Sequence, residues 1–120
     1  MKSFNHNSGQ YFSIDKAKIY YEEIGMPTQP ILLLLHGGFG TIENFNPIIP
    51  DLFDKYRIIG IDSRGQGKST TGNENLTYEL LQNDVEALLH YLNIESLSII
   101  GFSDGGIVAF PGELLLLCQC

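Results

Sequence analysis

The sequence is short of basic residues and of long apolar runs. Its 120 residues contain 7 Lys and Arg against 14 Asp and Glu, which gives a formal net charge of −7. Binding to a phosphate backbone requires clustered Lys and Arg, so no nucleic-acid partner is expected. Even the longest apolar runs, such as Ile31–Leu35, are far too short to cross a bilayer, so no membrane partner is expected either.

Cysteine is also scarce, and its placement excludes two classes of site. Cys118 and Cys120 both fall in the last three residues. A disulfide framework would need cysteines spaced through the chain, and a zinc site would need two more ligands nearby. We therefore expect no disulfide and no metal site. The polar start of the sequence contains no apolar stretch of the secretory type, so the expected location is cytoplasmic.

Turn and loop residues divide the chain into short apolar segments and two amphipathic ones. Strands are predicted at residues 11–14, 18–24, 31–35, 57–61 and 97–100, and helices at 45–53 and 77–92. The continuously apolar segment 31–35 is typical of a central strand buried on both faces. Pro47 and Pro50 each remove a backbone donor, which leaves the start of the first helix open. This order predicts one α/β domain with a mainly parallel sheet and flanking helices.

The stretch Ser98–Gly106 has the pattern of a nucleophile elbow. A β-branched run leads directly into Gly101-Phe102-Ser103-Asp104-Gly105, and the small residues suit a sharp turn from strand to helix. Such a turn holds its serine in a strained backbone conformation with the hydroxyl exposed. The pattern predicts Ser103 as a nucleophile. The plainer interpretation is a glycine-rich turn that contains a serine by chance.

The loop His36-Gly37-Gly38-Phe39-Gly40 is the second candidate element of a site. Acyl transfer places negative charge on a carbonyl oxygen, which two fixed backbone N–H groups can stabilise. The predicted donors are the amides of Gly38 and Asp104. His36 is expected to brace this loop by hydrogen bonding rather than to act as a base.

Two glycine motifs in the loop after residue 61 do not support nucleotide binding. Gly67-Lys68-Ser69 resembles the end of a phosphate-binding loop, but Asp62 occupies the position of the required first glycine. Gly65-Gln66-Gly67 begins a dinucleotide fingerprint whose third glycine would fall at Thr70. No cofactor is therefore expected.

Taken together, three ordered motifs resemble the α/β-hydrolase superfamily. They are His36–Gly40, Asp62–Ser69 with its Asp-x-Arg-Gly-x-Gly-x-Ser pattern, and Gly101–Gly106. The resemblance covers about residues 10–110 and is greatest to small esterases, lactonases and aminopeptidases. It implies a serine hydrolase that acts through an acyl-enzyme on carboxylic esters, lactones or related acyl compounds. It also implies a mainly structural role for the Asp62–Ser69 loop.

The sequence departs from the superfamily pattern after Ser103. In this fold a triad acid and then a histidine follow the nucleophile in the chain. The histidines present are His6, His36 and His90, all of which precede Ser103. Glu113 is the one acidic residue beyond Asp104. No residue therefore matches the family's base, and the 120 residues alone are expected to be inactive.

The end of the sequence is also atypical. Pro111 and Gly112 would interrupt the helix that should follow the elbow. We interpret residues 1–110 as the N-terminal part of an α/β-hydrolase domain and residues 111–120 as an atypical apolar tail. The strand 98–101 is then expected to be an exposed edge through which the chain self-associates. The alternative function is a non-catalytic truncated fragment or an interaction module.

Overall fold

A mixed β-sheet forms the centre of the fold. The computed structural model describes residues 3–37, 40–72, 77–101 and 113–114. Within these ranges the strands are β1 (Gln10–Ile14), β2 (Ala17–Ile24), β3 (Ile31–Leu35), β4 (Arg57–Ile61), β5 (Ser98–Gly101) and β6 (Glu113–Leu114). Their order in the sheet is β1-β2-β4-β3-β5-β6. The β1-β2 and β2-β4 pairs are antiparallel, whereas β4, β3, β5 and β6 are parallel. The predicted α/β class with a mainly parallel sheet is confirmed.

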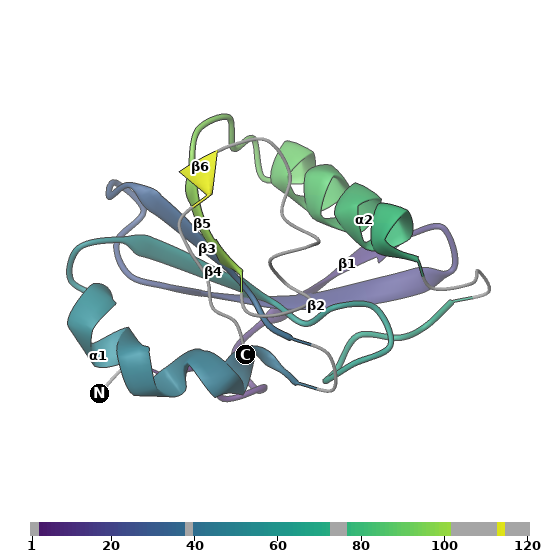
Figure 1. The fold of residues 1–120 in the computed structure, drawn as a ribbon, viewed down its shortest axis with the longest axis horizontal. Helices are drawn as coiled ribbons and strands as arrows, with labels where there is room; N and C mark the ends of the chain where they lie inside the picture. The colour runs from purple at the N-terminus through teal and green to yellow at the C-terminus, as the bar shows by residue number, and fades with distance from the viewer. Residues whose placement is uncertain (1–2, 38–39, 73–76, 102–112, 115–120) are drawn as a thin grey trace.

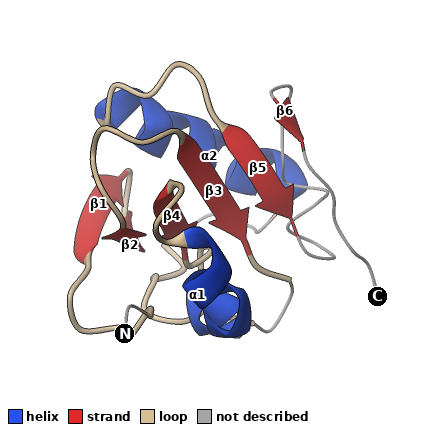
Figure 2. Cartoon of the chain, turned by 90° about the vertical axis from the view of Figure 1, so that its left-hand side faces the viewer, coloured by secondary structure: helices blue, strands red, loops and turns tan. Residues whose placement is uncertain are grey.

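Helices cover both faces of this sheet (Figures 1 and 2). One face packs against α2 (Tyr78–Tyr91), and the other packs against the consecutive helices η1 (Ile42–Ile48) and α1 (Ile49–Leu52). Strand β3 supplies both cores, because alternate side chains of a strand point to opposite faces. Its Leu33 and Leu35 join the α2 side, and its Leu32 and Leu34 join the η1 side. The predicted burial of β3 on both faces is confirmed.

The first predicted helix differs from the expectation of one continuous α-helix. The helical region begins three residues earlier than predicted, as the 3-10 helix η1 with Pro47 inside, and only the short α1 is α-helical. Pro47 and Pro50 both lack the backbone donor that a regular α-helix would use. A 3-10 helix has about three residues per turn instead of 3.6, so different side chains face the sheet than in an α-helix. Ile42 is fully buried, while Ile48, expected in the core, is 38% exposed.

The second helix agrees with its prediction. Thr77 is the N-cap of α2, and its Oγ1 accepts a hydrogen bond from the Leu80 amide at 3.0 Å. The side chains expected on the polar face are exposed, and they are Glu79, Asn83, Glu86 and His90. Among the helices of the described ranges, none combines the length and the apolar character that a bilayer crossing requires.

The sheet edge at β5 is less open than expected. Glu113 and Leu114 form β6 and pair in parallel with Ser98 and Ile99. The expectation of an edge exposed along all of Ser98–Gly101 is therefore wrong for its first half, because a short piece of the apolar tail satisfies the backbone there. The predicted elbow and the break predicted at Pro111 and Gly112 fall on residues 102–112, which lie outside the described residues, as does the rest of the tail at 115–120.

Gly60 in β4 provides a test of how the sheet packs against Phe4 and η1. A Cβ atom at this position would lie 2.7 Å from Cζ of the buried Phe4 and 3.1 Å from Cγ2 of Ile42. Overpacking a core of this kind costs about 1–3 kcal/mol. We expect Gly60→Ala to lower the free energy of unfolding by that amount in urea denaturation. In the Phe4→Leu background the cost should be smaller, and equal costs in the two backgrounds would contradict this packing.

Candidate active site

The register of the parallel strands brings the ends of three strands to one edge of the sheet. Leu35 of β3 is opposite Ile61 of β4 on one side and opposite Gly101 of β5 on the other. The segments that follow these residues in the chain therefore begin side by side, and this carboxyl edge is where α/β sheets bind their ligands. The predicted site residues Gly38, Ser103 and Asp104 come two or three residues after these strand ends and lie outside the described residues.

His36 joins the loop after β3 to the loop after β4. Its side chain is buried, with 2% exposure. Nδ1 lies 2.6 Å from the carbonyl oxygen of Gly37, and Nε2 accepts a hydrogen bond from the Ser63 amide at 3.0 Å. A carbonyl can only accept and an amide can only donate, so the proton must reside on Nδ1. His36 therefore braces the loop, as expected, and both of its ring nitrogens are engaged.

Burial determines the charge of His36. Burial lowers the pKa of His36 below 6.5, and this effect outweighs the hydrogen bond to Gly37 and the charge of Asp62, which favour protonation. A second ring proton would also face the Ser63 amide. His36 is therefore neutral in the folded state near pH 7.

Asp62, the first residue after β4, connects several segments through one buried carboxylate. The residue is 0% exposed. Its Oδ1 accepts a hydrogen bond from the Ile42 amide at 2.9 Å, and its Oδ2 accepts one from the Lys68 amide at 3.0 Å. Oδ2 also lies 2.7 Å from Nε2 of His6. A buried charge requires such partners, because an unsatisfied carboxylate would be strongly destabilising.

The loop that follows Asp62 folds around this carboxylate. Gly67 has a φ of +56°, and a Cβ at this position would overlap the Asp62 carboxylate, so glycine is required there. Ser69 Oγ donates to the Asp62 carbonyl oxygen at 2.6 Å and accepts from the Tyr20 amide at 2.7 Å. Asp62, Gly67 and Ser69 thus hold the loop in shape, which agrees with the structural role implied by the resemblance.

Arg64 and Asp84 form a buried ion pair between this loop and α2. The exposures of the two residues are 1% and 3%. Arg64 Nε lies 2.9 Å from Asp84 Oδ2, and Nη2 lies 2.6 Å from Oδ1, which is the two-pronged geometry typical of arginine with a carboxylate. The pair connects the loop after β4 to α2, which comes later in the chain, after residues 73–76.

The N-terminal segment also reaches this region, although no local pattern predicted it. Asn46 of η1 binds Phe4 twice, because its Oδ1 accepts from the Phe4 amide at 2.8 Å and its Nδ2 donates to the Phe4 carbonyl at 3.0 Å. Glu22 is buried and accepts from the amides of Asn5 and His6 at 3.1 and 2.6 Å. These contacts hold the segment before β1 against the sheet.

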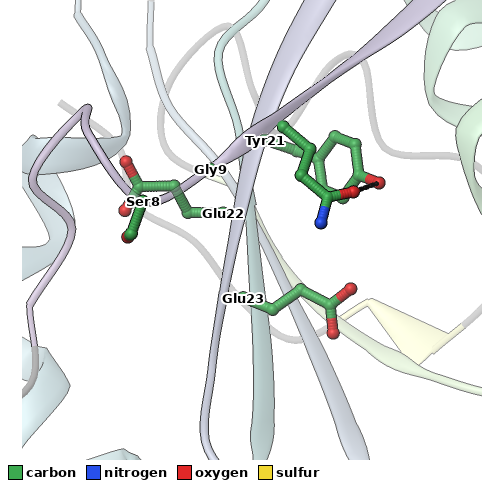
Figure 3. Close-up of a pocket in the computed structure, with 6 residues that line it drawn as sticks. Ser8, Gly9, Tyr21, Glu22 and Glu23 are labelled. Atoms are coloured by element: carbon green, nitrogen blue, oxygen red, sulfur yellow. Dashed lines mark hydrogen bonds between the residues drawn. The ribbon is translucent and has the colours of Figure 1, made fainter.

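A pocket of about 230 Å³ lies at the start of β1, where the N-terminal segment meets β2. Figure 3 shows Ser8 and Glu22 on one side of the strand and Tyr21 and Glu23 on the other. Its polar groups already have partners. Tyr21 donates to Gln10, Glu23 pairs with Arg57 at 2.8 Å, and Glu22 binds the N-terminal segment. We assign no chemistry to this pocket.

The sequence analysis predicted neither the Arg64–Asp84 pair nor the His6–Asp62 pair, although the first had a signal in the sequence. Asp84 stands three residues after Leu81 and four before Leu88, so it falls on the apolar face of α2. A charged residue on a buried face predicts a buried partner. His6 offered no comparable signal, because its partner Asp62 is 56 residues away in the chain.

The Arg64–Asp84 pair predicts a large effect on stability. Asp84→Asn leaves the buried guanidinium without its counter-charge, and breaking a buried pair in this way costs about 3–5 kcal/mol. Arg57→Gln is the matched control, because Arg57 pairs with the partly exposed Glu23 and exposed pairs contribute about 0–1 kcal/mol. Equal losses in urea denaturation of the two variants would contradict the assignment.

The neutral state of His36 predicts a dependence on pH. Below pH 6.5 the unfolded chain takes up a proton that folded His36 resists, so the contribution of His36 to the free energy of unfolding falls as pH falls through this range. Gln carries one donor group and one acceptor group at the end of its side chain and does not titrate. The advantage of the parent over His36→Gln should therefore shrink between pH 7.5 and about 5 in urea denaturation. An advantage that grows with acidity would show that His36 is charged when folded.

Comparisons with known proteins agree on one family. A family model described as the alpha/beta hydrolase fold matches residues 30–110. A Haemophilus influenzae protein whose name suggests an esterase/lipase is 35% identical over 89 residues, which cover 74% of this chain and 30% of that protein. Proline iminopeptidase of Arabidopsis thaliana is 36% identical over 109 residues, which cover 87% of this chain and 28% of that protein.

The fold agrees with the same family. The crystal structure of a hydrolase from Pseudomonas aeruginosa superposes with a TM-score of 0.83 at 26% identity, covering 94% of this chain and 45% of that one. The chain spans about 30% of the length of the two curated relatives, from Haemophilus influenzae and Arabidopsis thaliana. The family match extends from the start of β3 through β5 and therefore includes the carboxyl edge of the sheet. On these grounds the chain belongs to the α/β-hydrolase superfamily.

Proposed function

We propose that the chain carries the nucleophile half of a serine hydrolase that cleaves carboxylic esters, lactones or related acyl compounds. In this proposal Ser103 Oγ attacks the acyl carbon while a base accepts its proton, and the leaving alkoxide takes a proton as the acyl-enzyme forms. Water then releases the acid and restores the serine. The amides of Gly38 and Asp104 bind the oxyanion at both stages.

The strand register is the observation that carries this proposal. Leu35 and Gly101 are opposite each other on adjacent parallel strands, and each is the last residue of its strand. Gly38 comes three residues after Leu35, and Ser103 comes two residues after Gly101. An acyl group bound at this edge would need both loops within a few ångströms, and adjacent parallel strands favour that arrangement.

The described contacts of the three histidines support a second part of the proposal, that these 120 residues lack a working base. His36 uses both ring nitrogens in backbone hydrogen bonds. The ring nitrogens of His6 face Glu43 and Asp62. His90 lies in the last turn of α2, close to where the chain turns toward the start of β5. The length of β5, roughly 13 Å, therefore separates it from the carboxyl edge.

The relatives limit the substrate class only broadly. One carries an esterase/lipase name and another is a proline iminopeptidase. Both names concern the hydrolysis of an acyl group bound to oxygen or nitrogen, which is the chemistry that an activated serine performs. The proposed substrate is therefore a small acyl compound, and no metal or cofactor is needed for this mechanism.

A fluorophosphonate probe tests the role of Ser103. Attack by Oγ on phosphorus expels fluoride and leaves a stable phosphonate ester on the serine. Without a base, we expect slow labelling of the chain and negligible hydrolysis of p-nitrophenyl acetate, because an unassisted hydroxyl is a poor nucleophile. Free imidazole supplies an external base, and it should raise labelling at Ser103 as measured by peptide mass spectrometry.

Two variants separate the outcomes of this test. Ser103→Ala should abolish the labelling that imidazole induces, whereas Ser96→Ala, at an exposed serine before β5, should leave it unchanged. Rapid labelling of Ser103 without imidazole would show that a base is present after all. No labelling of Ser103 under any condition would remove its role as nucleophile and favour the non-catalytic alternative.

A further inference from the structure

We propose that His6 is a pH-sensitive clasp, which in its protonated form ties the N-terminal segment and the start of η1 to the loop after β4. The proposal concerns the described residues near the carboxyl edge and does not depend on the role of Ser103. It assigns a specific task to the N-terminal segment, which precedes the part of the chain that the family model matches.

The geometry around the imidazole carries this inference. Nε2 lies 2.7 Å from Oδ2 of Asp62, and Nδ1 lies 3.3 Å from Oε2 of Glu43. A carboxylate oxygen can only accept a hydrogen bond, and a neutral imidazole has a single N–H. The neutral ring would therefore leave one carboxylate opposite a nitrogen lone pair. Only the imidazolium satisfies both contacts.

The surroundings of His6 favour the same state. The side chain is 16% exposed, and its backbone amide is fixed by Glu22 of β2 at 2.6 Å. Burial opposes the charge, but the hydrogen bonds and charges of Asp62 and Glu43 outweigh burial and raise the pKa of His6 above 6.5. The charged and titratable groups around it are Asp62 and Lys68 of the β4 loop, Glu43 of η1, Tyr20 and Glu22 of β2, and His36 after β3.

The clasp acts at the point where three segments meet. The carboxylate that binds His6 also accepts the Ile42 amide in the first turn of η1 and the Lys68 amide in the following loop. Glu43, on the other side of the ring, is the next residue of η1. Loss of the His6 proton breaks one of two contacts and leaves Asp62 with less positive charge nearby. We therefore expect the start of η1 and the N-terminal segment to loosen together.

The sign of the effect follows from linkage. The folded state binds the His6 proton more tightly than the unfolded chain does, so the stabilisation is complete below pH 6.5. It is lost as pH rises through the pKa of folded His6. His36 acts in the opposite direction, with a penalty that appears as pH falls. In a comparison with a His6 variant at each pH, the burial effect on His36 cancels, and the difference contains the clasp and the repulsion between the two imidazoles.

Nuclear magnetic resonance of the imidazole nitrogens in the intact chain tests the clasp directly. We expect both nitrogens of His6 to carry protons at pH 6.5 and the ring to titrate above that value. In Glu43→Gln the pKa of His6 should fall measurably, because Glu43 is surface-accessible and its replacement removes one of the two charges. A His6 pKa at or below 6.5 in the parent, or an unchanged pKa in Glu43→Gln, would overturn the proposal.

Hydrogen exchange provides the conformational readout. The protection of the Ile42 and Lys68 amides, corrected for intrinsic exchange, should fall severalfold between pH 6 and pH 8.5 in the parent. His6→Gln should show low protection at both values, and His90→Gln, which removes an exposed histidine of α2, should behave as the parent. Protection that does not change with pH in the parent would show that no clasp opens. If His6→Gln does not fold, the imidazole titration and the parent's exchange still decide the question.

Discussion

The arrangement of the carboxyl edge depends on the hydrogen bonds that the buried carboxylate of Asp62 accepts. It receives hydrogen bonds from the Ile42 and Lys68 amides and a contact from His6, while the backbone of Asp62 binds Tyr20 and Ser69. A fully buried charge is tolerated only when it is satisfied in this way. The η1 helix, the β4 loop and the N-terminal segment therefore share one anchor, and their positions are coupled.

Two histidines near this anchor differ in charge: His36 is neutral and His6 is positively charged. Their ring partners differ accordingly. His36 lies between a carbonyl oxygen and an amide, which together require one proton on the ring. His6 lies between two carboxylates, which together require two. Burial outweighs the partners of His36 and keeps it neutral, whereas the two carboxylates outweigh burial at His6, which is less deeply buried. The same edge of the sheet thus contains one acid-sensitive and one base-sensitive contact.

Local patterns predicted five strands, the second helix and the bracing role of His36, but not the partners of Asp62 or Asp84. Strands β3 and β4 and the N-cap Thr77 follow from periodicity and capping, which operate over a few residues. The 3-10 start of the first helix required knowing how Pro47 would be accommodated. His6 and Asp62 meet across 56 residues, a distance at which no pattern in one sequence carries information. The motif residues Gly38, Ser103 and Asp104 stay predictions.

The strand order has a consequence for synthesis on the ribosome. Strand β4 lies between β2 and β3 but follows both in the chain, and Tyr21 pairs with Ile61. At about 5–20 residues per second, about 1–5 seconds separate the translation of Leu35 from that of Ile61. During this interval the leucines of β3 have no neighbouring strand, because β5 is made later still. Residues 31–35 are therefore apolar and unpaired during this interval, and exposed apolar strands of a folding chain are prone to aggregate.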